Sequence, residues 1–258
     1  MRDALTLETR GAVATLTLDR AEKRNPIAFD MWSRLPGLLA DVAADDAVKV
    51  LVVRGAGDEA FLAGADLGEF DRYRADVAGA RAYDAATQRA EGALATFPKP
   101  SIAMIHGFCI GGGAALALAC DLRFADTKAR FGIPAARLGI VFGFGATRRL
   151  VDLAGPAVAR HLLFSGLPLD ARRAYEVGLV DRLEAPEVLE AETLAYAELL
   201  CSRSQRSIRA SKQLLLRIAA GQLGGDADTL ELRDAAFDGE DYAEGVRAFL
   251  EKRPPRFA

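Results

Sequence analysis

Residues 110–121, IGGGAALALACD, contain three consecutive glycines after Ile110, and the first charged side chain that follows them is that of Asp121. The residues before the glycines, SIAMIHG (101–107), form a short apolar run typical of a strand buried on both faces. The residues after them, AALALAC (114–120), have the composition of a buried helix. The stretch therefore predicts a strand, a glycine loop, and a helix that begins at that loop.

The same alternation of strand and helix extends outward from this stretch. Apolar runs predict further buried strands at VKVLVVRG (48–55) and LRFAD (122–126). Helical spacing predicts helices over 29–46, interrupted by Pro36, and from about Glu69 to Thr96. Strands that alternate with helices indicate βαβ crossovers and a parallel sheet.

The two ends of the chain have a different character. Apolar and polar residues alternate on both sides of Arg10-Gly11 within 4–20, which predicts a β-hairpin. After about Gly143 the pattern is mostly helical, with LVDRL (179–183) as one brief strand. We expect an α/β core over residues 1–190 and a helical C-terminal region over 191–258. Amphipathic helices of such a region pack on their own core or on a neighbouring subunit.

Composition excludes several classes of protein. The chain has 258 residues, of which 51% are hydrophobic and 27% charged, with a net charge of −3. This balance is typical of a globular protein and argues against a nucleic-acid or membrane partner. The N-terminus has no apolar signal core, and no run of 18 apolar residues occurs. We therefore expect a soluble, cytoplasmic protein.

Metal and nucleophile motifs are not found. The three cysteines, Cys109, Cys120 and Cys201, have neither metal-site nor disulfide spacing. The two histidines, His106 and His161, are a poor basis for a zinc site or a Ser-His-Asp triad. No Gly-x-Ser-x-Gly nucleophile elbow occurs. We expect no bound metal.

Two glycine loops each follow a predicted strand, FLAGADL (61–67) and FCIGGGAA (108–115). Ligands of open parallel sheets bind beyond the carboxyl ends of the strands, where both loops should lie. The second loop also begins a helix, whose first N–H groups are unpaired. One N–H from each loop could form an oxyanion hole; alternatively, the glycines only permit tight turns and close packing.

A dinucleotide-binding loop fits the same glycines poorly. Gly111-x-Gly113 follows a strand and precedes a helix, but Leu116 stands where the third glycine should be. Arg130 and Phe131 stand about 20 residues on, where an acidic ribose contact is expected. The sequence therefore disfavours nicotinamide chemistry.

Several ordered motifs resemble the enoyl-CoA hydratase/isomerase (crotonase) superfamily over nearly the whole chain. The segments that carry the resemblance are AFLAGADL (60–67), PKPSIAMIHGFCIGGGAALALACDLRFAD (98–126), ARFGIPAARLGI (129–140), LLFSGLPLDARRAYEVGLVDRL (162–183) and EDYAEGVRAFLEKRPPRF (240–257). The resemblance implies a ββα superhelix whose helical C-terminal region drives formation of a trimer or a dimer of trimers. It also implies an acyl-CoA thioester as substrate, with coenzyme A as part of that substrate and no separate cofactor.

The resemblance assigns the binding roles mostly to the backbone. The N–H groups of Ala65 and Gly112 would hold the thioester oxygen and stabilise an enolate. The adenine end of CoA would lie against the backbone, and its phosphates near cations. The residues at these positions are Ala63, Asp66 and Leu67 for the adenine, and Lys23 and Lys252 for the phosphates. Each lysine could equally be a solvated surface charge.

The sequence departs from the hydratases of that family at both catalytic carboxylates. The two glutamate positions are Ala115, two residues after the glycine triplet, and Ala135, in FGIPAARLG. Isomerases keep the second glutamate, which is also absent. An alanine methyl cannot transfer a proton, and positioned proton transfer contributes about 10²- to 10⁴-fold. We therefore predict weak or no hydration, with the oxyanion hole retained.

Other residues could replace these carboxylates. Glu69 and Tyr73 lie one helical turn apart after the first glycine loop, on a helix that commonly lines the acyl pocket in the family, and they are the candidates for acid/base work. Arg137 could pair with a carboxylate, while Phe142 and Phe144 would make the pocket apolar. For three further polar residues we expect structural roles: Asp66, His106 and Asp121.

Three functions remain open. The chain could be a crotonase-fold enzyme that acts on a CoA thioester with a different acid or base, as an isomerase, hydrolase or decarboxylase. It could be an acyl-CoA binding protein without chemistry, which the two alanines favour. It could also be an oligomeric interaction module whose glycines are only structural, which the retention of both glycine loops disfavours.

Overall fold

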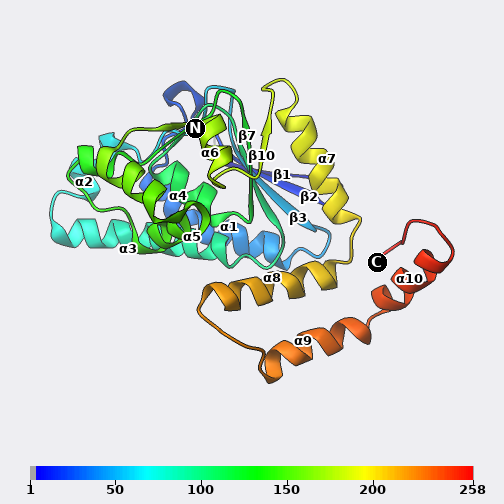
Figure 1. Cartoon of the computed structure of the whole chain (residues 1–258). Coiled ribbons are helices and arrows are strands. Elements are labelled where there is room, and N and C mark those ends of the chain that lie inside the picture. The colour runs from blue at the N-terminus through cyan, green and yellow to red at the C-terminus, as the bar shows by residue number, and fades with distance from the viewer. Residues whose placement is uncertain (1–3, 258) are drawn as a thin grey trace.

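The N-terminal hairpin is confirmed in the computed structural model, which describes residues 4–257 (Figure 1). Strand β1 (Leu5–Arg10) pairs antiparallel with β2 (Val13–Leu18). Gly11, between them, has φ +59°, a backbone conformation that glycine adopts without a steric penalty.

Two sheets contribute to the core, and successive strands from β3 to β8 belong in turn to one sheet and then to the other. The described residues form a six-stranded sheet in the order β1-β2-β3-β5-β7-β10, parallel from β2 onward, and a four-stranded sheet in the order β4-β6-β8-β9. The strands not yet bounded are β3 (Val50–Gly55), β4 (Ala60–Leu62), β5 (Ser101–Ile105), β6 (Phe108–Ile110), β7 (Leu122–Asp126), β8 (Arg130–Gly132), β9 (Leu169–Asp170) and β10 (Arg182–Glu184).

Each repeat of the chain adds one strand to each sheet and then a helix. Strands β3 and β4 precede α2 (Phe70–Tyr73) and α3 (Val77–Ala95), and β5 and β6 precede α4 (Gly112–Ala119). Strands β7 and β8 precede α5 (Phe144–Arg160). The expected ββα repeat is therefore confirmed.

The six-stranded sheet is covered on both faces. Helices α1 (Phe29–Ala44), α3, α4 and α5 contribute to the main hydrophobic core. Helix α7 (Leu189–Cys201) lies on the other side of the sheet, over a smaller core that contains Val50, Ile102 and Phe124 (Figure 1). Burial on both faces explains why β3 and β5 are almost continuously apolar.

Pro36 was expected to interrupt the first helix, but it does not. Helix α1 runs through it from Phe29 to Ala44. A proline inside a helix costs about 3 kcal/mol. The helix also buries Met31, Trp32 and Leu35, and this burial offsets the loss.

The long helix expected from Glu69 to Thr96 is divided. A 3-10 turn (Leu67–Glu69) leads into the short helix α2, and α3 begins only at Val77. The Asp76 carboxylate accepts a hydrogen bond from the N–H of Gly79 (2.7 Å) and so caps the new helix. The brief strand expected at 179–183 is displaced by a few residues to β10.

The C-terminal helices extend away from the core. After α6 (Ala171–Glu176) and α7, the chain forms α8 (Gln205–Ala219), α9 (Ala227–Phe237) and α10 (Glu240–Leu250) (Figure 1). The Lys212 ammonium ties α8 to the core, because it donates to the Asp121 carboxylate (2.7 Å) and to the carbonyl of Lys99 (2.9 Å). The expected boundary at 190/191 falls inside α7, which packs on the sheet, so the division into two regions stays a prediction.

Large apolar side chains are exposed on these three helices. They include Leu215, Ile218, Leu230, Phe237, Phe249 and Leu250.

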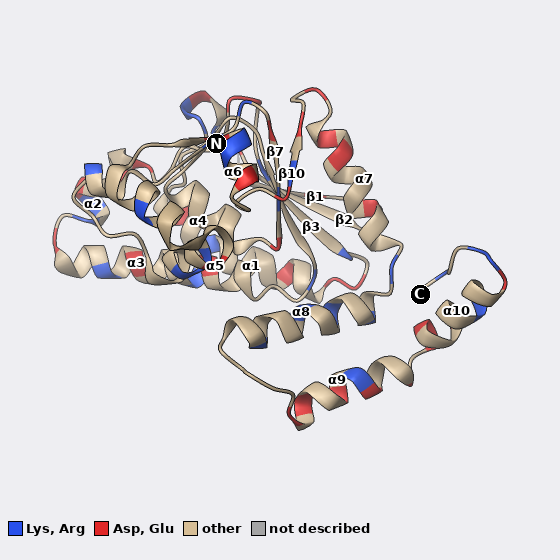
Figure 2. Ribbon diagram, in the orientation of Figure 1, with Lys and Arg blue, Asp and Glu red and all other residues tan. Residues whose placement is uncertain are grey.

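Acidic and basic residues occur on both the core and the extension (Figure 2). No helix within residues 4–257 is long and apolar enough to cross a membrane.

Candidate functional site

The two glycine loops lie side by side because they follow neighbouring strands. Strand β4 pairs with β6 in parallel, so both loops leave the same edge of the four-stranded sheet. Gly64 has φ +108° and Gly111 has φ +54°. Side chains with a Cβ rarely adopt this region, which explains a glycine in each loop.

The N–H of Ala65 makes no hydrogen bond among the described residues. Ile27 bridges this loop, but it donates to the carbonyl of Gly64 (2.8 Å) and accepts from the N–H of Asp66 (3.0 Å). Because these bonds use the neighbours of Ala65, its own N–H remains unpaired at the wall of a cavity.

The N–H of Gly112 is a second unpaired donor at the same place. Gly112 is the first residue of α4, where helical N–H groups lack partners, and none is found for it within residues 4–257. A methyl group built on Gly112 would lie 3.7 Å from the nitrogen of Ala65. The structure thus brings together the two residues that the sequence assigned to an oxyanion hole.

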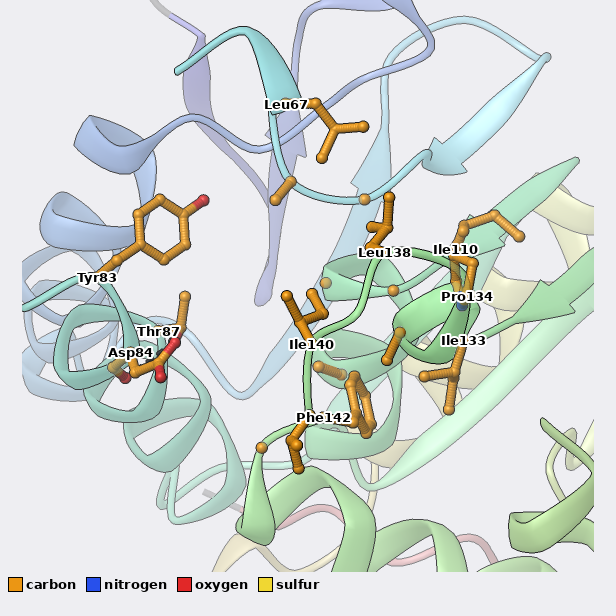
Figure 3. Close-up of a pocket in the computed structure, with 18 of the residues that line it drawn as sticks. Leu67, Tyr83, Asp84, Thr87, Ile110, Ile133, Pro134, Leu138, Ile140 and Phe142 are labelled. Atoms are coloured by element: carbon orange, nitrogen blue, oxygen red, sulfur yellow. Dashed lines mark hydrogen bonds between the residues drawn. The ribbon is translucent and has the colours of Figure 1, made fainter. Parts of the chain in front are cut away.

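A cavity of about 200 Å³ opens beside these two residues (Figure 3). Its lining includes Ala115 and Ala135, the two positions at which the resemblance predicted glutamate in hydratases. Tyr83, Asp84 and Thr87 of α3 lie on one side of the cavity and Leu138, Ile140 and Phe142 on the other (Figure 3).

Tyr83 and Trp32 are buried polar residues of this lining. Each residue is 1% exposed, and neither the Tyr83 hydroxyl nor Trp32 Nε1 has a hydrogen-bond partner in the described structure. Burial raises the pKa of Tyr83, and the Trp32 indole beside its hydroxyl opposes the rise. The phenol is therefore uncharged at neutral pH.

Glu91 is the buried carboxylate of the lining. Its Oε2 lies 2.9 Å from a guanidinium nitrogen of Arg149. Burial raises the pKa of Glu91 and the charge of Arg149 opposes the rise. Tyr83 and Glu91 were not predicted as site residues, although their separation of eight residues, with Thr87 midway, places them on one face of a helix.

Glu69 and Tyr73 do not line the cavity. The Glu69 carboxylate accepts a hydrogen bond from the N–H of Phe29 (2.8 Å), a donor at the start of α1 that has no partner within its own helix. The Tyr73 ring stacks on Phe29, with 4.3 Å between ring centroids. The structure thus provides both residues with partners at α1 and places neither beside Ala115.

The residues expected to bind CoA lie in different parts of the structure. Ala63 and Leu67 line the cavity, and the Ala63 carbonyl accepts no hydrogen bond from the described residues. Lys23 is exposed and close enough to Asp66 to lower the pKa of its carboxyl. Lys252 follows α10 on the helical extension and is not part of the lining.

Asp66 holds the first glycine loop in shape, as expected. Its carboxylate contacts a guanidinium nitrogen of Arg20 (2.7 Å) and accepts from the N–H of Gly68 (3.1 Å). Although burial raises the pKa of this carboxyl, the Arg20 and Gly68 hydrogen bonds outweigh it and hold the pKa below its ordinary value.

Of the remaining candidate residues, Asp121 has a structural role and Phe142 lines the cavity. Asp121 accepts hydrogen bonds from the N–H (2.8 Å) and hydroxyl (3.0 Å) of Ser101, which confirms its structural role. Phe142 lines the cavity, whereas Arg137 and the 82% exposed Phe144 do not. Among residues 4–257 no cluster of three or more His, Cys, Asp or Glu side chains could hold a metal ion.

The chain is similar to known proteins over nearly its whole length. Residues 8–258 match the family model described as enoyl-CoA hydratase/isomerase. The chain is 35% identical to a crotonyl-CoA hydratase of Syntrophomonas wolfei, with 97% of this chain and 96% of that protein covered. It is 32% identical to a short-chain-enoyl-CoA hydratase of Clostridium acetobutylicum, with coverages of 96% and 94%.

Solved structures have the same fold. A crystal structure of an enoyl-CoA hydratase/carnitine racemase from Magnetospirillum magneticum superposes with a TM-score of 0.95 at 34% identity, covering 100% of this chain and 96% of that one. An enoyl-CoA hydratase from Bacillus anthracis superposes with a TM-score of 0.89 at 29% identity, covering 99% of each chain.

Proposed function

The chain belongs to the enoyl-CoA hydratase/isomerase family and has the crotonase fold, and from this premise we propose that its cavity binds an acyl-CoA with the thioester oxygen at the N–H groups of Ala65 and Gly112. The single observation that supports this is the pair of unpaired N–H groups at one end of the cavity. Each such donor can stabilise an enolate oxygen by about 2.7–4 kcal/mol. The pair therefore activates the carbon next to the thioester.

We propose further that classical hydration is weak or absent. Adding water to a C=C bond needs a base for the water and an acid for the α-carbon. The methyl groups of Ala115 and Ala135 face the cavity where these groups would be needed. The same observation favours the alternatives of a different crotonase reaction, such as isomerisation, hydrolysis or decarboxylation, or of an acyl-CoA binding protein without chemistry.

The CoA moiety is proposed to lie outside the acyl cavity along the first glycine loop. The open carbonyl of Ala63 and the backbone of Asp66 and Leu67 suit the adenine, and Lys23 suits a phosphate. Lys252 lies on the extension, so its contribution would require a neighbouring subunit. No cofactor besides the CoA of the substrate is proposed, and cytoplasmic location stays a prediction.

Binding and turnover test the proposal separately. Calorimetry with butyryl-CoA, which cannot be hydrated, should show binding in the micromolar range; no binding at high micromolar ligand would refute it. Hydration of crotonyl-CoA should be very slow in the wild type and faster in Ala115→Glu/Ala135→Glu. The matched control is Ala115→Gln/Ala135→Gln, because glutamine has the shape of glutamate but cannot act as its acid or base.

The helical extension is proposed to assemble the chain into a trimer or a dimer of trimers. Helices α8, α9 and α10 expose large apolar side chains that a monomer leaves in water, among them Phe237 and Phe249. Light scattering after gel filtration measures the mass directly. A monomer at micromolar concentration would contradict this proposal without affecting the acyl-CoA site.

A further inference from the structure

Two hydrogen-bond donors in the cavity have nothing to bind. The Tyr83 hydroxyl and Trp32 Nε1 are buried atoms of cavity-lining residues that are each 1% exposed, and neither has a partner within residues 4–257. Buried polar atoms are almost always hydrogen-bonded, so two unpaired ones in a single cavity indicate a ligand atom that completes them.

The surrounding residues hold the Tyr83 ring in place. Its ring centroid lies 5.5 Å from that of Phe29 and 6.0 Å from that of Phe70, and the guanidinium carbon of Arg74 lies 4.2 Å from the Tyr83 centroid. Figure 3 shows its hydroxyl directed toward the interior of the cavity. Because the ring is enclosed, the hydroxyl cannot turn out to water to find a partner.

Trp32 lies directly beside the thioester position. A methyl group built on Gly112 would approach Trp32 Cζ2 to 3.0 Å, and Nε1 belongs to the same edge of the indole. The indole N–H is always a donor, and burial raises the pKa of Tyr83 so that its phenol also keeps its proton. The cavity therefore offers two uncharged donors near the two backbone donors.

We propose that Tyr83 and Trp32 bind an oxygen substituent of the acyl chain, so that the site prefers acyl groups that carry a hydroxyl or carbonyl oxygen close to the thioester. A plain alkyl chain would leave both buried donors without a partner, whereas an acceptor oxygen satisfies them. This proposal rests on the acyl-CoA function proposed above and specifies the class of acyl group.

The test compares two ligands of equal length. Calorimetry measures the affinity for butyryl-CoA and for both enantiomers of 3-hydroxybutyryl-CoA. In the wild-type protein one enantiomer should bind about three- to tenfold more tightly than butyryl-CoA, as one neutral hydrogen bond provides. In Tyr83→Phe the ratio of the two affinities should fall by a similar factor.

A control and a second variant complete the design. Tyr175→Phe, at a half-exposed tyrosine of α6 outside the cavity, should keep the wild-type preference. Trp32→Phe removes the other donor and should also lower the preference. Equal binding of the ligands by the wild type, or a preference that both cavity variants retain, would overturn the inference and leave the acyl-CoA function standing. If butyryl-CoA fails to bind at all, the proposed function itself fails.

Discussion

Acidification is predicted to destabilise the fold through His106. This residue lies in the turn between β5 and β6, is 6% exposed, and has no hydrogen-bond partner for Nε2 among the described residues. Burial, aided by the positive charge of Arg54, lowers the pKa of His106 from 6.5 to about 4. Its ring is therefore neutral in the folded protein at pH values where an unfolded chain would already be protonated.

The direction of the change in stability with pH follows from which state, folded or unfolded, binds the proton. Below about pH 6.5 the unfolded chain takes up a proton on His106, whereas the folded protein does so only near pH 4. The stabilisation is therefore fully present above pH 6.5 and is lost as the pH falls through 4. A difference of about 2.5 pKa units, at 1.36 kcal/mol each, corresponds to about 3 kcal/mol.

Urea denaturation of the wild type and His106→Asn measures this loss. Asparagine keeps a side-chain amide for the backbone contact at Ala60 but does not titrate. Between about pH 7 and pH 4, the free energy of unfolding should fall by about 3 kcal/mol more in the wild type than in the variant. Parallel curves, or a His106 NMR titration centred near 6.5, would refute the reasoning.

Three further variants probe the packing by urea denaturation. Tyr83→Phe should keep or raise the free energy of unfolding, by about 1 kcal/mol, because it removes an unpaired buried hydroxyl; a clear loss would mean that the hydroxyl has a partner in the free protein. Arg149→Met should cost about 2 kcal/mol, since it leaves the Glu91 carboxylate buried without a cation, and an unchanged midpoint would contradict this. Gly107→Ala should fail to yield folded protein, because a Cβ there would clash with the carbonyl oxygen of Glu59 and φ is +56°; a native circular dichroism spectrum would show the backbone to be adaptable.

The strands of the six-stranded sheet could be predicted because they rest on local patterns. Buried strands such as β3 and β5 are continuously apolar, and the hairpin alternates, so each is visible in a short window. The predictions that differed depend on context. Pro36 breaks an isolated helix but is tolerated in α1, since the helix buries Trp32 and its neighbours.

For the candidate site, too, local features could be predicted from the sequence, whereas features that depend on distant residues could not. The two glycine loops were predicted to follow the strands at 48–55 and 101–107, whereas in the structure they directly follow β4 and β6, whose parallel pairing brings them together. Glu69 was assigned to acid/base work from its position after the first loop, but it binds the N–H of Phe29, which is 40 residues away in the sequence. Spacing along one helix does not show which side chain a distant helix terminus will engage.

By itself, the sequence determined the alternation of strands and helices, the two glycine loops, and the absence of carboxylates at Ala115 and Ala135, because each is a property of residue identity or short-range order. Only the tertiary structure decided that Ala65 and Gly112 lie side by side, and that Tyr83 lines the same cavity. The lining of a cavity depends on how α1, α3 and α4 pack against one another, and burial removes the alternative partners that water would provide.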